Sequence, residues 1–262
     1  MIFAVRFYVF LSLYSLAALI FWFYVYLHAN TQLFTCYVCD GVQELKGRYD
    51  FIVVGSGTAG AIIAHRLAQD TKVSVLLLEA GPYSNFLFDV PVLGPLLQQS
   101  SIDWQYETIP QKDACLGLKK NISRWPMGRL FGGTGRLNNM IHTRGHKQDY
   151  DDWYKHQTNY NYKTDIVDYY ERLESRNKRY SSSRPVAVSS PRFVSPLAES
   201  ILKAAVYLGH STENTNSVNH LDFKEPMVNL RNGKRWTPSD SLLTVKPDNL
   251  HILTNAPVTK SV

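Results

Sequence analysis

The sequence predicts a protein of the α/β class built around a parallel sheet, because two apolar runs flank a helical stretch. The runs YDFIVVG (49–55) and KVSVLLLEAG (72–81) are apolar without alternation and contain or border glycine. This pattern is typical of strands buried on both faces of a parallel sheet. Residues 58–70 between them place small and apolar side chains at helical spacing. Strand, helix and strand in this order form a βαβ unit.

Two longer helices are predicted downstream. NYKTDIVDYYERLES (161–175) and SPLAESILKAAVYLG (195–209) both show helical periodicity. In the second, Ser195 is the expected N-cap, Pro196 belongs to the first turn, and Gly209 ends the helix. These capping residues make the second helix the better delimited of the two.

The rest of the pattern predicts a globular body. The carboxylates of DYDDW (149–153) suit the start of a helix, where acids complement the dipole. The final residues, 249–262, are strand-like, and no internal repeat of solenoid length occurs. A chain of 262 residues with 45% hydrophobic residues can bury a sizeable core.

The charge distribution argues against a nucleic-acid partner. The formal net charge is +6, but the basic residues are scattered except in the serine-rich stretch 171–185. That cluster comprises Arg172, Arg176, Lys178, Arg179 and Arg184. We interpret it as a solvated loop and keep a nucleic-acid-binding patch as the weaker alternative.

Residues 1–28 are predicted to be a signal anchor or a cleaved signal peptide. From Phe7 to Leu27 the chain carries no charged residue, and about 20 apolar residues cross a bilayer core. The run is longer than the apolar region of most signal peptides, which favours the anchor. A buried core helix is a further alternative, which the many aromatic residues of the run disfavour.

The flanking charges predict an orientation and a location. Arg6 precedes the apolar run, whereas Asp40 and Glu44 follow it in a short stalk over residues 29–48. The positive-inside bias then places the remainder in the lumen or outside the cell. The sequon Asn121-Ile122-Ser123 fits this location. We therefore predict a protein of the secretory pathway, either membrane-anchored or secreted.

Cysteines and histidines predict no metal site. Cys36 and Cys39 could close a small disulfide, but a lone CxxC is weak support for zinc. The spacings of His65, His210, His220 and His251 suggest no ligand set either.

A glycine-rich turn after the first predicted strand points to a dinucleotide. Gly55, Gly57 and Gly60 fit G-x-G-x-x-G between a strand and a helix. The glycines allow a tight turn, a close approach to a pyrophosphate, and close packing of helix and strand. The phosphates would lie at the helix N-terminus. Glu79, at the end of the second strand, can accept hydrogen bonds from ribose hydroxyls. These residues favour a dinucleotide site over a purely structural turn, and they leave NAD and FAD open.

A second glycine-rich loop adds a resemblance to a known family. WPMGRLFGGTGRLNNMIHTRGHKQDYDDW (125–153) resembles the first signature of the glucose–methanol–choline (GMC) oxidoreductases, FAD enzymes that oxidise alcohols. The similarity continues through NGKRWTPSDSLL (232–243) and covers about residues 47 to 262, with the character of the insect glucose-dehydrogenase-like branch. It implies FAD rather than NAD as the cofactor.

The resemblance also implies a set of cofactor contacts. The first loop would bind the pyrophosphate, Glu79 the adenosine ribose, the second loop the flavin, and Val258 the adenine through its main chain. The predicted contacts are Gly55, Ser56, Gly57, Thr58, Ala59, Gly60, Glu79, Ala80, Gly133, Thr134, Asn138, Asn139, Met140, Ile141 and Val258.

The family chemistry removes two hydrogens from an alcohol carbon, with a base taking the hydroxyl proton and the flavin taking the hydride. In the family the catalytic histidine lies in a C-terminal part that this sequence does not contain. The resemblance therefore implies a Rossmann-like FAD-binding domain over 49–262, an incomplete substrate domain and no catalytic residue in this chain. Sugars, sterols and small alcohols are the candidate substrates.

Five positions depart from the family pattern. One of them is Met127, which replaces a basic residue that is common in the family's WPRG segment. Phe131 and Arg136 replace smaller or aliphatic residues, and a bulky cation beside the flavin loop could alter or block the fit. Arg124 stands where insect relatives often carry a cysteine, so Cys115 is expected to be unpaired. His142 replaces an aromatic or other large residue, and we interpret it as a packed or surface histidine rather than a catalytic one.

Two functions follow as expectations. The first is the FAD-binding part of a GMC-type oxidoreductase acting on CH–OH groups of alcohols or sugars. The alternative is a truncated, non-catalytic protein that binds flavin or a partner.

Overall fold

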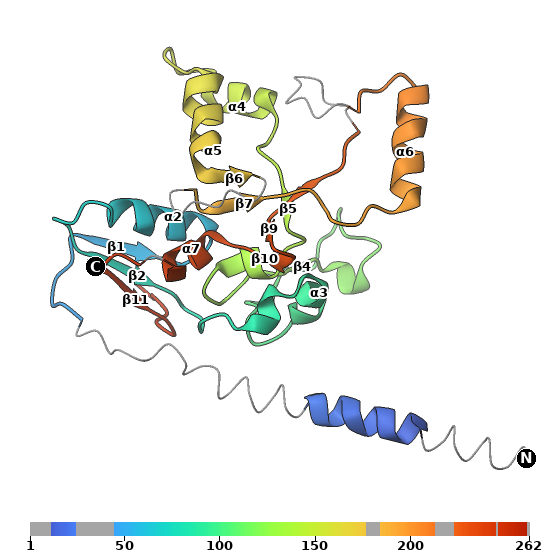
Figure 1. The fold of residues 1–262 in the computed structure, drawn as a ribbon, viewed down its shortest axis with the longest axis horizontal. Coiled ribbons are helices and arrows are strands. Elements are labelled where there is room, and N and C mark those ends of the chain that lie inside the picture. The colour runs from blue at the N-terminus through green and yellow to red at the C-terminus, as the bar shows by residue number, and fades with distance from the viewer. Residues whose placement is uncertain (1–11, 25–44, 177–183, 213–222, 245, 261–262) are drawn as a thin grey trace, which may run out of the picture. The chain divides into compact units, whose positions relative to one another are not determined.

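The computed structural model describes most of the chain (Figure 1), namely residues 12–24, 45–176, 184–212, 223–244 and 246–260. The chain divides into two units, Met1–Leu45 and Lys46–Val262. In the first unit, residues 12–24 form a helix. Its large apolar side chains are exposed.

The predictions for the N-terminal region fall only partly on described residues. The predicted span from Phe7 to Leu27 continues past the helix at both ends, and most of the predicted stalk, with Cys36 and Cys39, lies outside the described residues. Over the part of the chain that the structure describes, no helix has the length and apolar character needed to cross a membrane.

The second unit is centred on a three-stranded parallel sheet. Its strands are β1 (Phe51–Val54), β2 (Val75–Leu78) and β11 (Leu250–Leu253), in the order β1-β2-β11. Helix α2 (Thr58–Leu67) connects β1 to β2 and lies along the sheet (Figure 1). The predicted βαβ unit is confirmed, and so is a strand in the last predicted segment.

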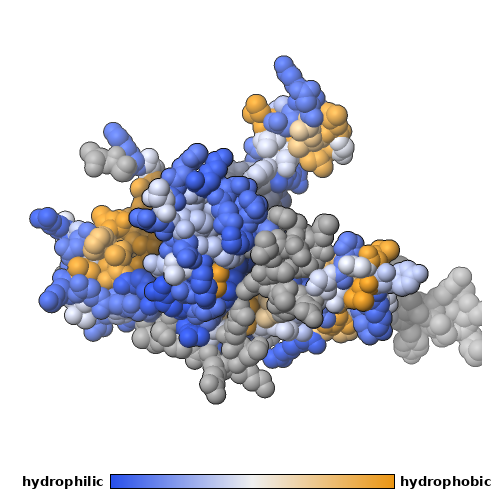
Figure 2. All heavy atoms as spheres, turned by 90° about the horizontal axis from the view of Figure 1, so that it is seen from above, coloured by the Kyte–Doolittle hydropathy of each residue, from blue (hydrophilic) through white to orange (hydrophobic). Residues whose placement is uncertain are grey.

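The prediction that both strands of this unit are buried on both faces is wrong for β1. Val75 and Leu77 of β2 are fully buried, but Ile52 is 58% and Val54 61% exposed. Ile52 and Val54 share one face of the sheet, whereas Val53, on the other face, packs against the apolar cluster that includes α2. Strand β1 is also an edge strand, since among the described residues it pairs only with β2. Figure 2 shows an apolar patch on the part of the second unit where Figure 1 places β1 and α2.

Small residues let α2 pack closely on the sheet. Ala61, Ala64 and Ala68 face Val75 and Leu77 of β2 in one apolar cluster. Helix α7 (Pro238–Thr244) packs beside α2 and contributes to the same cluster. Burial of apolar surface stabilises such a layer by about 25 cal/mol per Å².

Short elements follow β2, as expected for a segment rich in proline and glycine. They are η2 (Phe86–Asp89), η3 (Pro91–Leu93), α3 (Gly94–Leu97), β3 (Tyr106–Glu107), η4 (Lys119–Asn121), β4 (Arg124–Trp125), η5 (Gly133–Arg136) and β5 (Ile141–His142). Strands β3 and β4 form an antiparallel pair. A second apolar cluster, with Phe88, Ile102, Leu130 and Leu137, anchors this segment.

The remaining elements form helices and two-stranded sheets beside the central sheet. They are α4 (Lys147–Tyr154), the π-helix η6 (Lys163–Val167), α5 (Asp168–Leu173), β6 (Glu174–Arg176), β7 (Val186–Val188), α6 (Pro196–Tyr207), β8 (Met227–Val228), β9 (Leu230–Arg231) and β10 (Lys234–Arg235). The pairs are β5 with β8, β6 with β7, and β9 with β10.

Two helix predictions based on end signals are confirmed. Ser195 is the N-cap of α6, and its hydroxyl accepts from the amide of Leu197 at 3.2 Å. Gly209, with φ +84°, follows the helix. The acidic segment 149–153 lies within α4, where Asp149 forms a capping box with His146.

The predicted helix over 161–175 is confirmed except at its end. Helical structure runs from Lys163 to Leu173, and the chain then turns into β6. The strand begins at Glu174 because its carboxylate pairs with Arg144 and its backbone pairs with β7. Tertiary contacts therefore override the local helical periodicity here.

Candidate functional site

The N-terminus of α2 is an open anion-binding end. Gly57 is the N-cap residue, no side chain caps the helix, and no acidic residue lies in its first turn. Among the described residues, the amide groups from Gly57 to Gly60 have no protein acceptor. Free N–H groups and the helix dipole favour a negative group at this position.

Gly60 allows the close packing that the motif predicts. A Cβ atom on Gly60 would lie 2.0 Å from the carbonyl oxygen of Gly55, which itself has φ +93°. Such a contact requires the backbone to move. Only glycine therefore lets α2 start this close to the end of β1.

Glu79 lies at the end of β2, beside the first loop. It is 5% exposed. Its Oε2 accepts from the amide of Ser56 at 2.9 Å and from the Ser56 hydroxyl at 2.6 Å, while Oε1 accepts from the amide of Gly81 at 2.9 Å. Carboxylate oxygens have further lone pairs, so Glu79 both organises the loop and keeps acceptor capacity for a ligand.

The two glycine-rich loops are in contact. The amide of Gly132 donates to the Ser56 carbonyl at 3.2 Å. Gly133 has φ +58°, and a Cβ atom there would lie 2.8 Å from the Cα of Gly57. The structure thus brings together two motifs that are more than seventy residues apart in the sequence.

Hydrogen bonds fix the internal shape of the second loop. The amide of Gly128 donates to Thr134 Oγ1 at 3.2 Å, and the amide of Met140 donates to Asn138 Oδ1 at 2.9 Å. Met140 has φ +61°. The exposed residues of this loop include Thr134, Asn138, Asn139 and Ile141, so its surface is accessible to a ligand.

The segment after β11 joins the same edge of the sheet. The amide of Asn255 donates to the Gly81 carbonyl, and that of Ala256 donates to the Glu79 carbonyl, both at 2.9 Å. Val258 follows and is exposed, while Ala80 lies between the two acceptors. The predicted contacts of the first loop, Glu79 and Ala80 therefore lie near the carboxyl ends of the parallel strands, and those from Gly133 to Ile141 lie on the second loop. Val258 lies two residues beyond the segment that these hydrogen bonds hold.

The two bulky departures in the second loop point away from its exposed surface. Phe131 is fully buried against Tyr83, with ring centroids 5.1 Å apart. The Arg136 guanidinium is also fully buried and pairs with Asp89 and Asp240. The side chain of Arg136 is therefore buried against η2 and α7 and is not part of the exposed surface of the loop.

Sequence reasoning missed three charged residues behind this loop. Asp89 and Asp240 hold Arg136, and Arg235 donates to the Asn138 carbonyl at 2.6 Å. Burial raises the pKa of Asp89, and Arg136 opposes that shift. Burial, together with Arg136, lowers the pKa of Arg235 to about 10. The segment NGKRWTPSDSLL contains both Arg235 and Asp240, but nothing in its residue pattern indicates which residues they contact.

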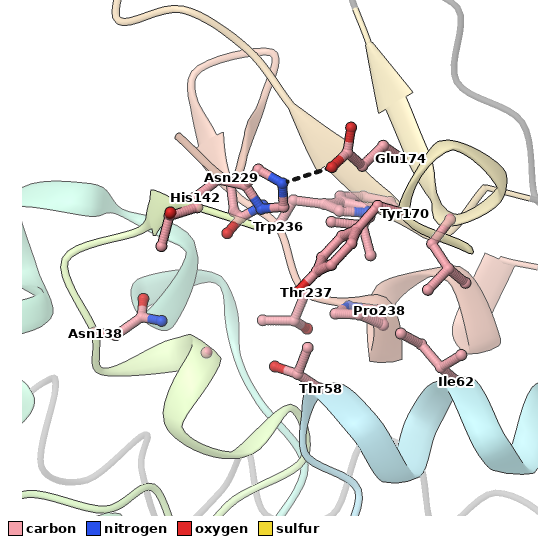
Figure 3. Close-up of a pocket in the computed structure, with 14 residues that line it drawn as sticks. Thr58, Ile62, Asn138, His142, Tyr170, Glu174, Asn229, Trp236, Thr237 and Pro238 are labelled. Carbon is pink, nitrogen blue, oxygen red and sulfur yellow. Dashed lines mark hydrogen bonds and ion pairs between the residues drawn. The ribbon is translucent and has the colours of Figure 1, made fainter. Parts of the chain in front are cut away.

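A cavity of about 250 Å³ adjoins the site (Figure 3). The residues that line it are far apart in the sequence: Thr58, Ile62, Gly135, Asn138, His142, Thr143, Tyr170, Leu173, Glu174, Val186, Asn229, Trp236, Thr237 and Pro238. Thr58 and Asn138 also belong to the predicted cofactor contacts.

His142 is a packed residue of that cavity. Its Nε2 lies 2.9 Å from Glu174 Oε1 (Figure 3), and its ring is edge-on to Tyr170. Glu174 is buried and accepts two hydrogen bonds of 2.7 Å from Arg144. The hydrogen bonds and Coulombic attraction of Glu174 raise the pKa of Arg144. Glu174 thus orients the imidazole as part of a buried polar cluster.

The described residues contain no group of three His, Cys, Asp or Glu side chains that could hold a metal ion. Cys115 is a free, half-buried cysteine.

The strongest binding feature is the open end of α2 with the carboxylate of Glu79 beside it. This pair fits the pyrophosphate and ribose of a dinucleotide.

Comparisons with known proteins agree with this geometry. The family model described as GMC oxidoreductase matches residues 49–262. Glucose dehydrogenase (FAD, quinone) of Drosophila pseudoobscura pseudoobscura is 32% identical over 228 residues, which are 83% of this chain and 36% of that protein. Ecdysone oxidase of Spodoptera littoralis is 33% identical over 226 residues, which are 81% of this chain and 38% of that protein.

A solved structure shows the same fold. Pyridoxine 4-oxidase from Mesorbium loti superposes with a TM-score of 0.64 and 28% sequence identity, covering 79% of this chain and 42% of that one. This chain thus spans less than half the length of the relatives it matches. The resemblance indicated by the two glycine-rich motifs is confirmed. The chain belongs to the GMC oxidoreductase family.

Proposed function

We propose that this chain binds FAD and forms the cofactor-binding part of an oxidoreductase that acts on CH–OH groups. The observation that carries the proposal is the open N-terminus of α2 in contact with the second glycine-rich loop, with Glu79 on the neighbouring strand. FAD as the predicted cofactor is confirmed at the level of the family.

Each part of the site has a role in this proposal. The amide groups from Gly57 to Gly60 would bind the pyrophosphate, and Glu79 would accept hydrogen bonds from the ribose hydroxyls. The second loop, from Gly133 to Ile141, would line the flavin. When bound, FAD supplies hydride acceptance, so the residues of this chain supply binding and orientation.

The substrate class is proposed from the relatives. Their names refer to glucose and ecdysone, both of which carry hydroxyl groups, so we propose alcohols or sugars. Anaerobic mixing of the FAD complex with glucose, ecdysone or a small alcohol tests this. Bleaching of the flavin band supports turnover by this chain. An unbleached band supports the alternative of a flavin-binding protein without turnover.

The decisive variant for cofactor binding is Gly57→Asp. An aspartate at the N-cap accepts from the first-turn amides and stabilises a helix, but its charge repels a pyrophosphate. We expect the Kd for FAD to rise by about 100-fold or more, close to 3 kcal/mol, without loss of thermal stability. Fluorescence titration with FAD and a thermal melt of the apoprotein measure the two effects.

The matched control is Gly117→Asp. A Cβ atom at Gly117 meets no atom within 4 Å, so this variant adds the same charge without disturbing the site. It should bind FAD like the wild type. Wild-type affinity of Gly57→Asp would mean that the end of α2 does not hold the pyrophosphate, and failure of the wild type to bind FAD would overturn the proposed function.

We also propose a secretory location, with residues 1–28 as signal anchor or signal peptide. The apolar run and the sequon at Asn121, in η4 between β3 and β4, support this. Expression in a secretory cell line should yield protein whose gel mobility increases after N-glycosidase treatment, and Asn121→Gln should abolish that shift. Unglycosylated protein in the cytosol would contradict the proposal.

A further inference from the structure

Two buried arginines hold the second glycine-rich loop from behind. Arg136 lies within the loop, in η5, and is 0% exposed. Arg235 lies far along the chain, in β10, and is 2% exposed. We define these two residues, together with Asp89 and Asp240, as the arginine clamp.

Arg136 ties the loop to two other elements. Its Nη1 lies 2.5 Å from Asp89 Oδ1 in η2, and its Nη2 pairs with Asp240 Oδ1 in α7. Asp240 also accepts from the amide of Thr237 at 2.7 Å through its other oxygen. One carboxylate therefore fixes both the start of α7 and the position of the loop.

Arg235 controls the path of the loop backbone. Its Nη1 donates to the carbonyl of Gly135 at 3.1 Å, to the carbonyl of Asn138 at 2.6 Å, and to Asn138 Oδ1 at 3.0 Å. The same Oδ1 accepts from the amide of Met140. Arg235 thereby sets the orientation of Asn138 and of the backbone that follows it.

The loop needs such external support because of its own conformation. Gly132, Gly133 and Met140 all have positive φ values, and a non-glycine residue in this region is uncommon. A buried charge that loses its partner is strongly unfavourable, so the clamp resists any movement of the loop that would separate its members.

We propose that Arg136 and Arg235 are positioning residues for FAD, which hold the loop from Gly133 to Ile141 in the conformation that meets the flavin. This proposal rests on the proposed FAD-binding function. Neither arginine contacts the cofactor in this scheme. Each acts through the backbone of the loop that does.

The test compares Arg136→Met and Arg235→Met with a variant that is only destabilising. Leu250→Ala serves as that control, because Leu250 is buried and pairs with Val75 at the amino ends of the strands, away from the loops. For each full-length protein we would measure the apoprotein melting temperature, the Kd for FAD, and the visible spectrum of the bound flavin.

Both arginine variants should raise the Kd for FAD by about tenfold or more. They should also change the shape of the visible flavin band, because the loop that would line the flavin is displaced. Leu250→Ala should lower the melting temperature while changing the Kd less than threefold and leaving the spectrum unchanged. Arg136→Lys, which keeps the charge but loses the planar fork of the guanidinium, should give intermediate values.

If Arg136→Met does not fold, Asp89→Asn is the second variant. Asp89 is partly exposed, and its replacement removes only one of the two ion pairs of Arg136. Wild-type Kd and spectrum in the arginine or Asp89 variants would overturn the clamp. Absence of FAD binding by the wild type would instead overturn the proposed function, so the two failures are distinguishable.

Discussion

At the scale of single residues, Asp103 shows how one side chain can organise a loop. It is buried, and its carboxylate accepts from the amides of Gln99 at 2.8 Å and of Gln105 and Met127 at 2.9 Å. Burial alone would raise the pKa of Asp103, but these three donors together lower it below its ordinary value. The ionised form is therefore favoured in the folded protein.

We expect Asp103→Asn to destabilise the fold by about 1–3 kcal/mol at pH 7. The side-chain nitrogen that replaces one carboxylate oxygen cannot accept the hydrogen bond from the backbone amide of Gln99, which leaves that donor unpaired. The pKa of Asp103 is lower in the folded protein than in the unfolded chain, where it is about 3.9. The stabilisation that the ionised carboxylate provides is therefore complete above the unfolded pKa and is lost as the pH falls through the folded pKa. Urea unfolding at pH 7, 5 and 3.5 should show the difference from the wild type shrinking only at the lowest pH. A difference independent of pH would contradict this assignment.

Residue types with local roles could be predicted from the sequence, whereas long-range partners could not. Gly57 and Glu79 follow from a motif whose geometry is local. Arg136 could be placed in the second loop but not paired, because Asp89 and Asp240 are distant in sequence and no periodicity links them. Its burial therefore emerged only in three dimensions.

At the scale of elements, the contact between β1 and α2 determines the geometry of the cofactor site. The Gly60 Cα lies so close to the end of β1 that a Cβ atom would meet the Gly55 carbonyl oxygen at 2.0 Å. The open end of α2 is therefore positioned by backbone packing rather than by side-chain caps.

Gly60→Ala should separate α2 from β1 and destabilise the protein by about 1–3 kcal/mol through overpacking. Its affinity for FAD should fall as well, because the helix end moves. Gly47→Ala is the control, since a Cβ atom there meets nothing within 4 Å. Denaturant midpoints of both variants give the comparison, and an equal, small change in both would argue against tight packing at Gly60.

Element ends were predictable where capping residues mark them, as in α6 with Ser195 and Gly209. The end of α5 was not, because Glu174 leaves the helix for a buried ion pair and a strand. Periodicity reports on the local chain only, so it cannot detect a partner such as Arg144.

At the scale of the whole molecule, the sheet exposes an apolar edge. Ile52 and Val54 of β1 are exposed, and β1 has one strand neighbour among the described residues. The sequence predicted the parallel sheet correctly but placed β1 inside it, because strand order is not encoded in the apolar run itself. Exposed apolar edge strands promote association.

Ile52→Lys should reduce self-association of the purified chain, because a charge on an edge strand opposes pairing with another strand. Ile109→Lys is the control, since Ile109 is exposed in the described structure but lies outside the assigned strands. Light scattering over a concentration series measures the effect. Equal reduction by both variants would show that general surface charge, rather than the edge of β1, is responsible.

The position of β11 has a consequence for the order of events during synthesis. Strand β2 occupies the centre of the sheet, but its second neighbour begins only at Leu250, far from β2 in the sequence. A nascent chain therefore carries β2 with one open side until Leu250 to Leu253 have been translated. Such non-local pairing slows folding and prolongs the lifetime of aggregation-prone intermediates. The sheet that supports the cofactor site is thus completed only when β11 emerges, and a molecular chaperone is most useful to this protein before that event.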